Sequence, residues 1–362
     1  MNFTALHGKR VLLTGHTGFK GSWLALWLHR LGATVYGYSL PPPTAPSNYQ
    51  LSNVRGVLAG ETIGDIRDRT LLRDTLASFN PDVVFHLAAQ PLVRDSYAQP
   101  FETFEVNVMG TASVLDAVRD RKRPCAVVCI TTDKCYENRE QVWGYRECDP
   151  MGGHDPYSAS KGAAEILIAS YRRSFFNPAE LAQHGVQLAS ARAGNVIGGG
   201  DWARDRIVTD LVSALTAGRP APVRNPHAIR PWQHVLEPLS GYLTLAAAML
   251  AKPDSRWCAG WNFGPVSGTE LPVGKLADAF VKAWGKGTWA DQSLPGQPHE
   301  ASILRLSIEK AGWDLGWHPR WSCAEMVEKT AHWYRSVLCE KADARQACEN
   351  DVKAYEQRTK SN

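Results

Sequence analysis

The chain has 362 residues, of which 44% are hydrophobic and 21% are charged, and its net charge is +4. This composition is typical of a globular protein with one large or two ordinary domains, and the nearly balanced charge without a Lys/Arg run argues against a nucleic-acid-binding protein. The sequence shows neither a leader peptide nor an apolar run of membrane-spanning length, and its eight cysteines lack the spacing of metal sites. We therefore expect a cytoplasmic protein with reduced thiols, no metal and no membrane partner.

Short apolar runs alternate with helical patterns over the first half of the chain. Strands are expected at 10–14, 34–38, just before Gly64, and at 82–87, 126–131 and 187–191, and helices at 22–31, 70–78, 101–118 and 157–173. This alternation predicts an α/β fold with a doubly wound parallel sheet of the Rossmann type.

The pattern changes after Arg192. We expect a loop at 198–202, a strand at 261–264, helices at 273–284 and 324–338, an irregular stretch at 295–321, and a final helix with a frayed tail within 343–362. The predicted domains are a dinucleotide-binding domain (1–192, with part of 230–265 returning to it) and a smaller, partly discontinuous substrate-binding domain (193–229 and 266–362).

A glycine-rich turn follows the first predicted strand and opens the first predicted helix. Its glycines are Gly15, Gly18 and Gly21, a spacing that allows a tight turn, close approach to a pyrophosphate and close helix packing. The acidic residue that usually binds the ribose is missing after the second strand, and Ser39 is the candidate substitute. No Arg lies there to favour a 2′-phosphate, so NAD is the expected cofactor. Further predicted cofactor contacts are Thr17, Phe19, Asp65, Ile66, Leu87, Ala88 and Ala89.

Tyr157 and Lys161 are four residues apart on a predicted helix, so both project from one face. A free phenol has a pKa of about 10, and a nearby ammonium and a positive nicotinamide are expected to lower it. Upstream, Thr132, Asp133 and Lys134 end the fifth predicted strand and bring a hydroxyl, an acid and an amine together. An alcohol dehydrogenase needs only the Tyr and Lys, whereas an enzyme that also expels water needs a second acid and base.

These motifs together resemble the extended short-chain dehydrogenase/reductases that act on nucleotide sugars. The resemblance runs over essentially the whole chain and includes the glycine turn, Leu87–Ala89, Asn107 and the Tyr157–Lys161 pair. The Thr132-Asp133-Lys134 motif, the segment 193–202 and the segment 230–235 are similar to the CDP-glucose 4,6-dehydratases in particular. The resemblance implies a nucleotide-sugar substrate, a role in bacterial deoxysugar pathways such as lipopolysaccharide O-antigen synthesis, and a homodimer or higher homo-oligomer formed by the helices at 101–118 and 157–173.

The implied reaction oxidises C4 of the hexose, eliminates water across C5 and C6, and reduces C6. Tyr157 is expected to take the proton of the 4-hydroxyl, with Thr132 bonded to the same oxygen. Asp133 is the candidate acid and Lys134 the candidate C5 base, although Lys134 is also open to a purely electrostatic role. Shifting a lysine pKa from about 10.4 to about 8 costs on the order of 3 kcal/mol, which burial can supply.

The resemblance also implies that Asn107, Tyr157 and Lys161 contact the cofactor. Residues expected to bind the substrate are Arg94, Ser96, Asn195, Asp201, Trp202, Arg230 and His299. Two alternatives stay open. A nucleotide-sugar epimerase or reductase on the same scaffold would use Tyr157 and Lys161 without Asp133 or Lys134, and a non-catalytic member would bind the dinucleotide only.

Overall fold

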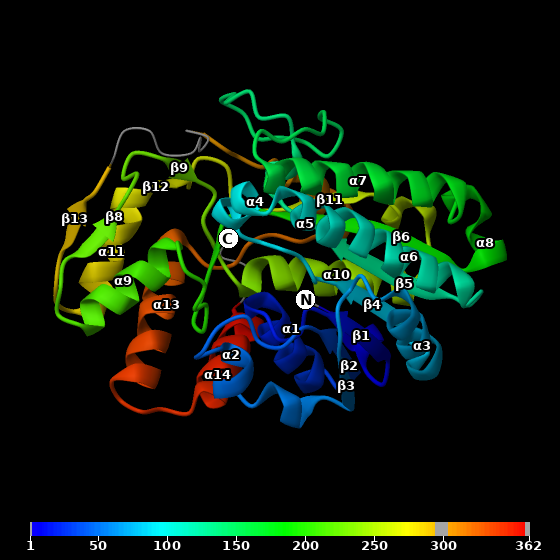
Figure 1. Ribbon diagram of the computed structural model, residues 1–362, viewed down its shortest axis with the longest axis horizontal. Coiled ribbons are helices and arrows are strands. Elements are labelled where there is room, and N and C mark those ends of the chain that lie inside the picture. The colour runs from blue at the N-terminus through cyan, green and yellow to red at the C-terminus, as the bar shows by residue number, and fades with distance from the viewer. Residues whose placement is uncertain (1, 294–302, 359–362) are drawn as a thin grey trace.

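The computed structural model describes residues 2–293 and 303–358, and its centre is a seven-stranded parallel sheet (Figure 1). The strand order is β11-β6-β5-β4-β1-β2-β3, and every neighbouring pair is parallel. The strands are β1 (Arg10–Thr14), β2 (Thr34–Ser39), β3 (Gly60–Ile63), β4 (Val83–His86), β5 (Cys125–Ile130), β6 (Val186–Ala193) and β11 (Gly260–Phe263). The predicted doubly wound α/β fold is confirmed.

Helices cover both faces of the sheet because consecutive side chains of its strands are apolar and point to opposite faces. In β1, Val11 and Leu13 join one buried cluster and Leu12 joins another on the opposite face. The first cluster includes side chains of α1 (Phe19–Arg30) and α10 (Leu236–Ala251), and the second includes those of α3 (Arg69–Phe79), α6 (Gly110–Asp120) and α7 (Pro156–Ser174). Gly32 follows α1 with a φ of +78°, the left-handed conformation expected after a helix end.

The helix predicted over 101–118 is built from three pieces. These are α5 (Pro100–Phe104), a π-helical segment η3 (Glu105–Met109) and α6. All three pieces contact α7. A π segment adds a residue to the turn and changes which side chains face the neighbouring helix, a feature that apolar spacing does not predict.

The smaller part of the molecule is formed by α9 (Ile207–Thr216), α11 (Val273–Trp284) and α13 (Cys323–Leu338), which lie to one side of the large sheet (Figure 1). Three short two-stranded sheets accompany them: β8 (Ala221–Val223) with β13 (Trp289–Asp291), β9 (Ile229–Arg230) with β12 (Leu271–Pro272), and β7 (Val196–Ile197) with β10 (Gln233–His234). The helix α12 (Glu309–Leu315) interrupts the stretch predicted to be irregular, so that prediction is wrong for these residues.

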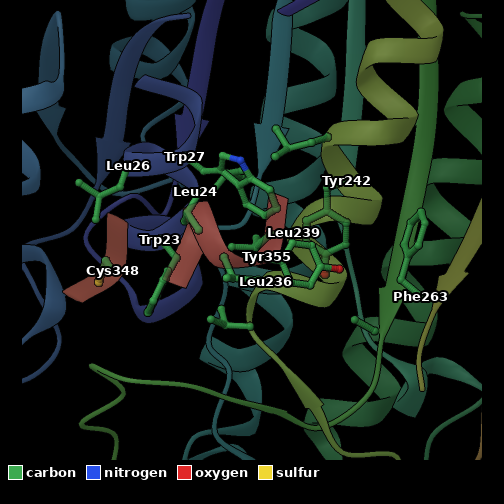
Figure 2. Close-up of a cluster of buried hydrophobic side chains, with 14 of the residues drawn as sticks. Trp23, Leu24, Leu26, Trp27, Leu236, Leu239, Tyr242, Phe263, Cys348 and Tyr355 are labelled. Carbon is green, nitrogen blue, oxygen red and sulfur yellow. The ribbon is translucent and has the colours of Figure 1, made fainter. Parts of the chain in front are cut away.

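The C-terminal helix α14 (Ala344–Gln357) packs against the first helix of the chain. Figure 2 shows Trp23 and Trp27 of α1, Leu236, Leu239 and Tyr242 of α10, and Tyr355 of α14 gathered in one cluster. The rings of Trp27 and Tyr355 meet edge to face with centroids 5.7 Å apart. Among the described residues, no helix is both long and apolar enough to cross a bilayer.

Candidate active site

A cavity of about 1220 Å³ opens at the carboxyl ends of the sheet strands. Its walls come from the loops after β1, β2, β4 and β5, from the start of α7, and from the segment between β6 and α9. Ligands of open parallel sheets bind at this edge. A pocket for one small molecule measures roughly 300–1,000 Å³, so this cavity has room for a dinucleotide and a nucleotide sugar together.

The glycine turn makes close backbone contacts that a side chain would block. Gly15 has a φ of +76°, and a Cβ there would lie 2.8 Å from the amide nitrogen of Ala88. A Cβ on Gly21 would lie 2.1 Å from the carbonyl oxygen of Gly15. Gly18 is the N-cap of α1 and bears no side chain, so the free amides of the helix start face the cavity. This cradle fits the diphosphate of a dinucleotide.

The residues predicted to bind the adenosine half line the same cavity. The hydroxyls of Ser39 and Thr17 are 2.8 Å apart, and Thr17 also donates to the carbonyl of Leu40. The Asp65 carboxylate pairs with Arg67 at 2.7 Å, and this contact is the main reason why the pKa of Asp65 is lowered. Ser39, Asp65 and Ile66 all line the cavity, and their roles as cofactor contacts stay predictions.

Four of the five predicted catalytic residues line the cavity: Thr132, Lys134, Tyr157 and Lys161. The Tyr157 phenol hydrogen-bonds with Thr132. Burial nevertheless raises the pKa of Tyr157 to about 12. Lys161 donates to the carbonyl oxygen of Ile130 at 3.4 Å, and burial lowers its pKa to about 8. Desolvation of Tyr157 is the largest effect on this pKa in the chain without its cofactor, and the expected lowering by the ammonium and the nicotinamide together stays a prediction.

Asp133 lies behind the cavity wall and is fully buried. One carboxylate oxygen, Oδ1, accepts a hydrogen bond from Thr132 at 2.9 Å and lies 3.5 Å from Nζ of Lys134, whose side chain is 27% exposed. The other oxygen, Oδ2, has no hydrogen-bond partner among the described residues. The acid and amine are thus adjacent, but only the amine is at the cavity surface.

Ser96 and Asn107 support the site without lining the cavity. The Ser96 hydroxyl accepts from the backbone amide of Tyr157 at 3.1 Å, so it fixes the first turn of α7. The Asn107 amide group donates to Ser160 at 2.8 Å and bonds both backbone groups of Gln90. The Ser96 and Asn107 side chains therefore hold α7 and the loop after β4 in place. Neither of them lines the cavity in which the substrate and the cofactor are expected to bind.

The other predicted substrate residues that the structure describes also line the cavity. Arg94, Asn195, Asp201, Trp202 and Arg230 all line it, whereas His299 lies outside the described residues. Oδ1 of Asn195 and Nε1 of Trp202 are buried without a partner among the described residues. Such groups usually find a ligand or an ordered water.

Sequence reasoning missed Lys20 and Arg206, which also line the cavity. Arg206 pairs with Asp201 at 2.8 Å, and its charge acts on both Tyr157 and Lys20. Lys20 lies inside the glycine turn, where the motif accepts any residue type. The signal that could have identified Lys20 is a charged residue at the start of an otherwise apolar helix.

The family model described as GDP-mannose 4,6 dehydratase matches residues 12–330. A CDP-glucose 4,6-dehydratase of Salmonella typhimurium is 52% identical over 333 residues, which cover 91% of this chain and 92% of that protein. A dTDP-glucose 4,6-dehydratase of Streptomyces antibioticus is 29% identical, with 90% and 92% covered. Among solved structures, a dTDP-glucose 4,6-dehydratase of Streptomyces venezuelae with NAD and TYD bound superposes with a TM-score of 0.77 at 24% identity, covering 90% of this chain and 97% of that one.

Proposed function

The chain belongs to the GDP-mannose 4,6 dehydratase family, and from this premise we propose that its cavity converts CDP-glucose to CDP-4-keto-6-deoxyglucose and water. The enzyme is an NAD-dependent lyase of the short-chain dehydrogenase/reductase superfamily. The observation that carries this function is the 52% identity to a CDP-glucose 4,6-dehydratase over 91% of the chain. Thr132, Lys134, Tyr157 and Lys161 line one cavity, with Asp133 buried next to Lys134, and this arrangement accords with the function.

The glycine turn from Gly15 to Gly21, with Ser39, Asp65, Ile66 and Leu87–Ala89, holds NAD. When bound, NAD supplies reversible hydride transfer and a positive ring, so C4 is oxidised and C6 reduced without net use of cofactor. Among the chain's own residues, Tyr157 receives the proton of the 4-hydroxyl and passes it back. Thr132, already bonded to the phenol, orients it and shares the substrate oxygen.

Lys161 assists Tyr157 from the same face of α7, where Ile130 holds its ammonium. The pair of Asp133 and Lys134 serves the elimination of water. A ketone at C4 makes the C5 proton acidic, and departure of the 6-hydroxyl requires a proton donor. The buried Asp133 carboxyl group lies 3.5 Å from Nζ of Lys134, so an acid and an amine are together where the leaving oxygen needs a proton. Lys134 acts here as base or as electrostatic helper.

The substrate diphosphate and hexose lie along Arg94, Asn195, Asp201, Trp202 and Arg230. Two arginines of this set offer planar donors that match phosphate oxygens. The buried, unpartnered Oδ1 of Asn195 and Nε1 of Trp202 are an acceptor and a donor available to hydroxyl or base groups of the ligand. The choice of CDP as the nucleotide is supported by the 52% identity to a CDP-glucose 4,6-dehydratase, and no residue that recognises the base is assigned.

A homodimer through α5, η3 and α7 is part of the proposal. Three large apolar side chains there are mostly exposed: Phe101 at 76%, Met109 at 59% and Ile166 at 60%. A monomer rarely leaves several such residues on adjoining helices uncovered.

A cytoplasmic location also stays a prediction, and its support is that all eight cysteines are free thiols.

The test is incubation with CDP-, dTDP-, GDP- and UDP-glucose while the 4-keto product is followed. Only CDP-glucose should be converted efficiently, and deuterium placed at C4 should appear at C6 of the product. A nucleotide-sugar epimerase would instead return a 4-epimer that keeps its 6-hydroxyl, and a reductase would consume reduced cofactor. Absence of turnover with every sugar, despite dinucleotide binding, would identify a non-catalytic member and overturn the proposal.

A further inference from the structure

We propose that His86 is a positioning residue for hydride transfer: its imidazole, held as the Nε2–H tautomer between Thr14 and Thr111, fixes the loop after β4 against the glycine turn. This inference rests on the proposed function and goes beyond it, because it concerns how the chain places the cofactor wall of the cavity relative to Tyr157. His86 is the last residue of β4, and its side chain is buried behind that wall.

The hydroxyl of Thr14, which ends β1, determines the direction of the hydrogen bonds. Its Oγ1 accepts from the backbone amides of Leu87 and Ala88, both at 3.1 Å, and lies 2.8 Å from Nδ1 of His86. The Leu87 amide is shared with the carbonyl oxygen of Thr14 at 3.2 Å. A hydroxyl oxygen has two lone pairs and one proton. Since two amide protons point at Oγ1, its own proton points to Nδ1, which accepts it.

The other ring nitrogen of His86 makes the complementary contact. Nε2 lies 3.1 Å from Oγ1 of Thr111, and this hydroxyl donates its own proton to the carbonyl oxygen of Asn107 at 2.7 Å. Thr111 therefore accepts from Nε2, which carries the imidazole proton. Both sides of the ring thus require the same neutral tautomer. Burial, which lowers the pKa of His86 to about 3, keeps the ring neutral.

The bridge through His86 joins two loops that line the cavity. The loop after β4 contributes Leu87 and Ala88 to the lining, and the glycine turn begins at Gly15, the residue after Thr14. The two backbones are in close contact, because a Cβ on Gly15 would lie 2.8 Å from the amide nitrogen of Ala88. A shift of the loop after β4 would therefore move both walls of the cavity.

The same network continues to the catalytic helix α7. Asn107 bonds the backbone amide and carbonyl groups of Gln90 at 2.9 and 3.1 Å and donates to Ser160 at 2.8 Å. Ser160 in turn donates to the carbonyl oxygen of Tyr157 at 2.7 Å. The side chains of the network are each exposed by 4% or less: Thr14, His86, Thr111, Asn107 and Ser160. Buried networks with paired polar groups are rigid, so this one holds the cavity wall at a fixed distance from the phenol.

The step that this distance serves is the oxidation of C4. The C4–H bond breaks and its hydride joins the nicotinamide ring of NAD⁺, while the proton of the 4-hydroxyl goes to Tyr157. C4 becomes a ketone and NAD⁺ is reduced, so no further reactant is needed. Transfer of this kind depends steeply on the alignment of the two reacting atoms.

The tautomer is tested without turnover. Nitrogen NMR of the full chain carrying isotope-labelled histidine, with and without NAD, gives the protonation of each ring nitrogen. The signal that is missing from His86→Leu identifies His86, and Thr111→Val should shift the same signal. It should report a proton on Nε2 and none on Nδ1. A proton on Nδ1, or on both nitrogens, would overturn the proposal.

The kinetics of His86→Leu, Thr111→Val and Thr111→Ser test the positioning. Thr111→Val keeps the shape of the side chain and loses both of its hydrogen bonds, whereas Thr111→Ser keeps the hydroxyl. His86→Leu and Thr111→Val should lower kcat with CDP-glucose by roughly 10- to 100-fold, because a misplacement of about 1 Å costs up to about 100-fold. Their KM should change less than about threefold, and Thr111→Ser should stay within about threefold of wild type in both constants.

Single turnovers separate positioning from a loss of folded protein. With saturating NAD and CDP-glucose, the rise in absorbance of reduced nicotinamide should be slowed in Thr111→Val, whereas partial unfolding would lower only its amplitude. Ser113→Ala is the matched control, because its hydroxyl lies on the same helix and donates to the carbonyl oxygen of Met109 at 3.0 Å. An amplitude that falls at an unchanged rate would make His86 purely structural and overturn the proposal. Failure of the proposed function looks different, because the wild type itself would then make no 4-keto product while NMR would still report the tautomer.

Discussion

The reactivity of Tyr157 is set by its neighbours more than by its own helix. Burial raises its pKa to about 12, and the hydrogen bond with Thr132 acts in the opposite direction. The phenol is therefore protonated in the unliganded chain near neutral pH, and its use as a base depends on the charge that the ligands bring.

Tyr157→Phe should lower kcat by at least about 100-fold, because the variant removes the proton acceptor and little volume. NAD affinity should change less than about twofold, since the ring stays. Tyr171→Phe is the matched control, because its phenol lies on the same helix and bonds Asp116 at 3.0 Å, away from the cavity. Steady-state kinetics and calorimetry would check both variants. A Tyr157→Phe enzyme with more than about a tenth of wild-type activity would place the base elsewhere.

Most of the site residues named from the sequence do line the cavity, because short motifs fix their position relative to strand ends. Thr132, Tyr157 and the glycine turn are local patterns, and their contacts follow from the fold. The burial of Asp133 behind the wall and the use of Ser96 and Asn107 as supports depend on which way a side chain turns, which spacing does not specify. Arg206 reaches the site only because the second part of the chain folds over the first.

Below the cavity, one buried charge network ties four elements together. Arg192 of β6 pairs with Glu165 of α7 at 2.7 Å and also donates to Tyr136, and Tyr136 in turn donates to Asn262 of β11. Glu165 accepts from Thr131, directly after β5, as well. Since Glu165 is one helical turn from Lys161, this network fixes the height of the catalytic face of α7.

Arg192→Met should reduce the free energy of unfolding by about 3–5 kcal/mol, because it leaves a buried carboxylate without its partner. The double variant Arg192→Met with Glu165→Leu should recover a large part of this loss. Lys275→Met is the control, since its exposed pair with Asp278 at 3.9 Å is worth about 1 kcal/mol or less. Denaturation by urea would measure all three. Equal stability of the single and double variants would show that the pair is not the source of the effect.

Apolar periodicity predicted the helices that have one polar face, such as α11, but α10 was not predicted. That helix is buried along most of its length, from Leu236 to Met249, and therefore lacks the contrast between faces. The π segment η3 was missed for a related reason: its cause is the packing of the chain against α7.

For the molecule as a whole, Glu237 of α10 couples stability to pH. Its carboxylate accepts from the backbone amides of Arg320 and Trp321 and from Tyr355, and burial raises its pKa from 4.5 to about 7. Below pH 4.5 the folded and unfolded chains are both protonated there. As the pH rises to about 7 the unfolded chain ionises first, so stability is lost across this window by on the order of 3 kcal/mol.

Glu237→Gln should remove this dependence. The free energy of unfolding of the wild type minus that of Glu237→Gln should therefore fall by on the order of 3 kcal/mol between about pH 4.5 and about pH 7.5. Glu328→Gln, an exposed residue of α13, serves as the control and should show no comparable change. Urea denaturation at several pH values gives the measurement, and a difference that does not vary with pH would contradict the role of Glu237.

The proposed dimer makes a separate prediction about assembly. Phe101→Glu and Ile166→Glu should each convert the protein to monomers, because a charge would be buried between the two copies. Trp313→Glu, which changes a side chain that is 91% exposed on α12, should leave the mass unchanged. Light scattering after gel filtration would report the mass. Dimers that survive both helix substitutions would exclude this surface.

The packing of α14 on α1 has a consequence for how the protein is made. Trp27 donates to Glu356 at 2.9 Å across a separation of 329 residues. A ribosome adds about 5–20 residues per second, so this face of the first helix stays uncovered for roughly 20 to 60 s after it has emerged. Trp27, whose ring meets Tyr355 of α14, lacks this cover during that interval, and a chaperone that shields it would serve until α14 arrives. The cofactor-binding half is therefore the first part of the chain to be synthesised, but its packing is complete only when α14 has been made.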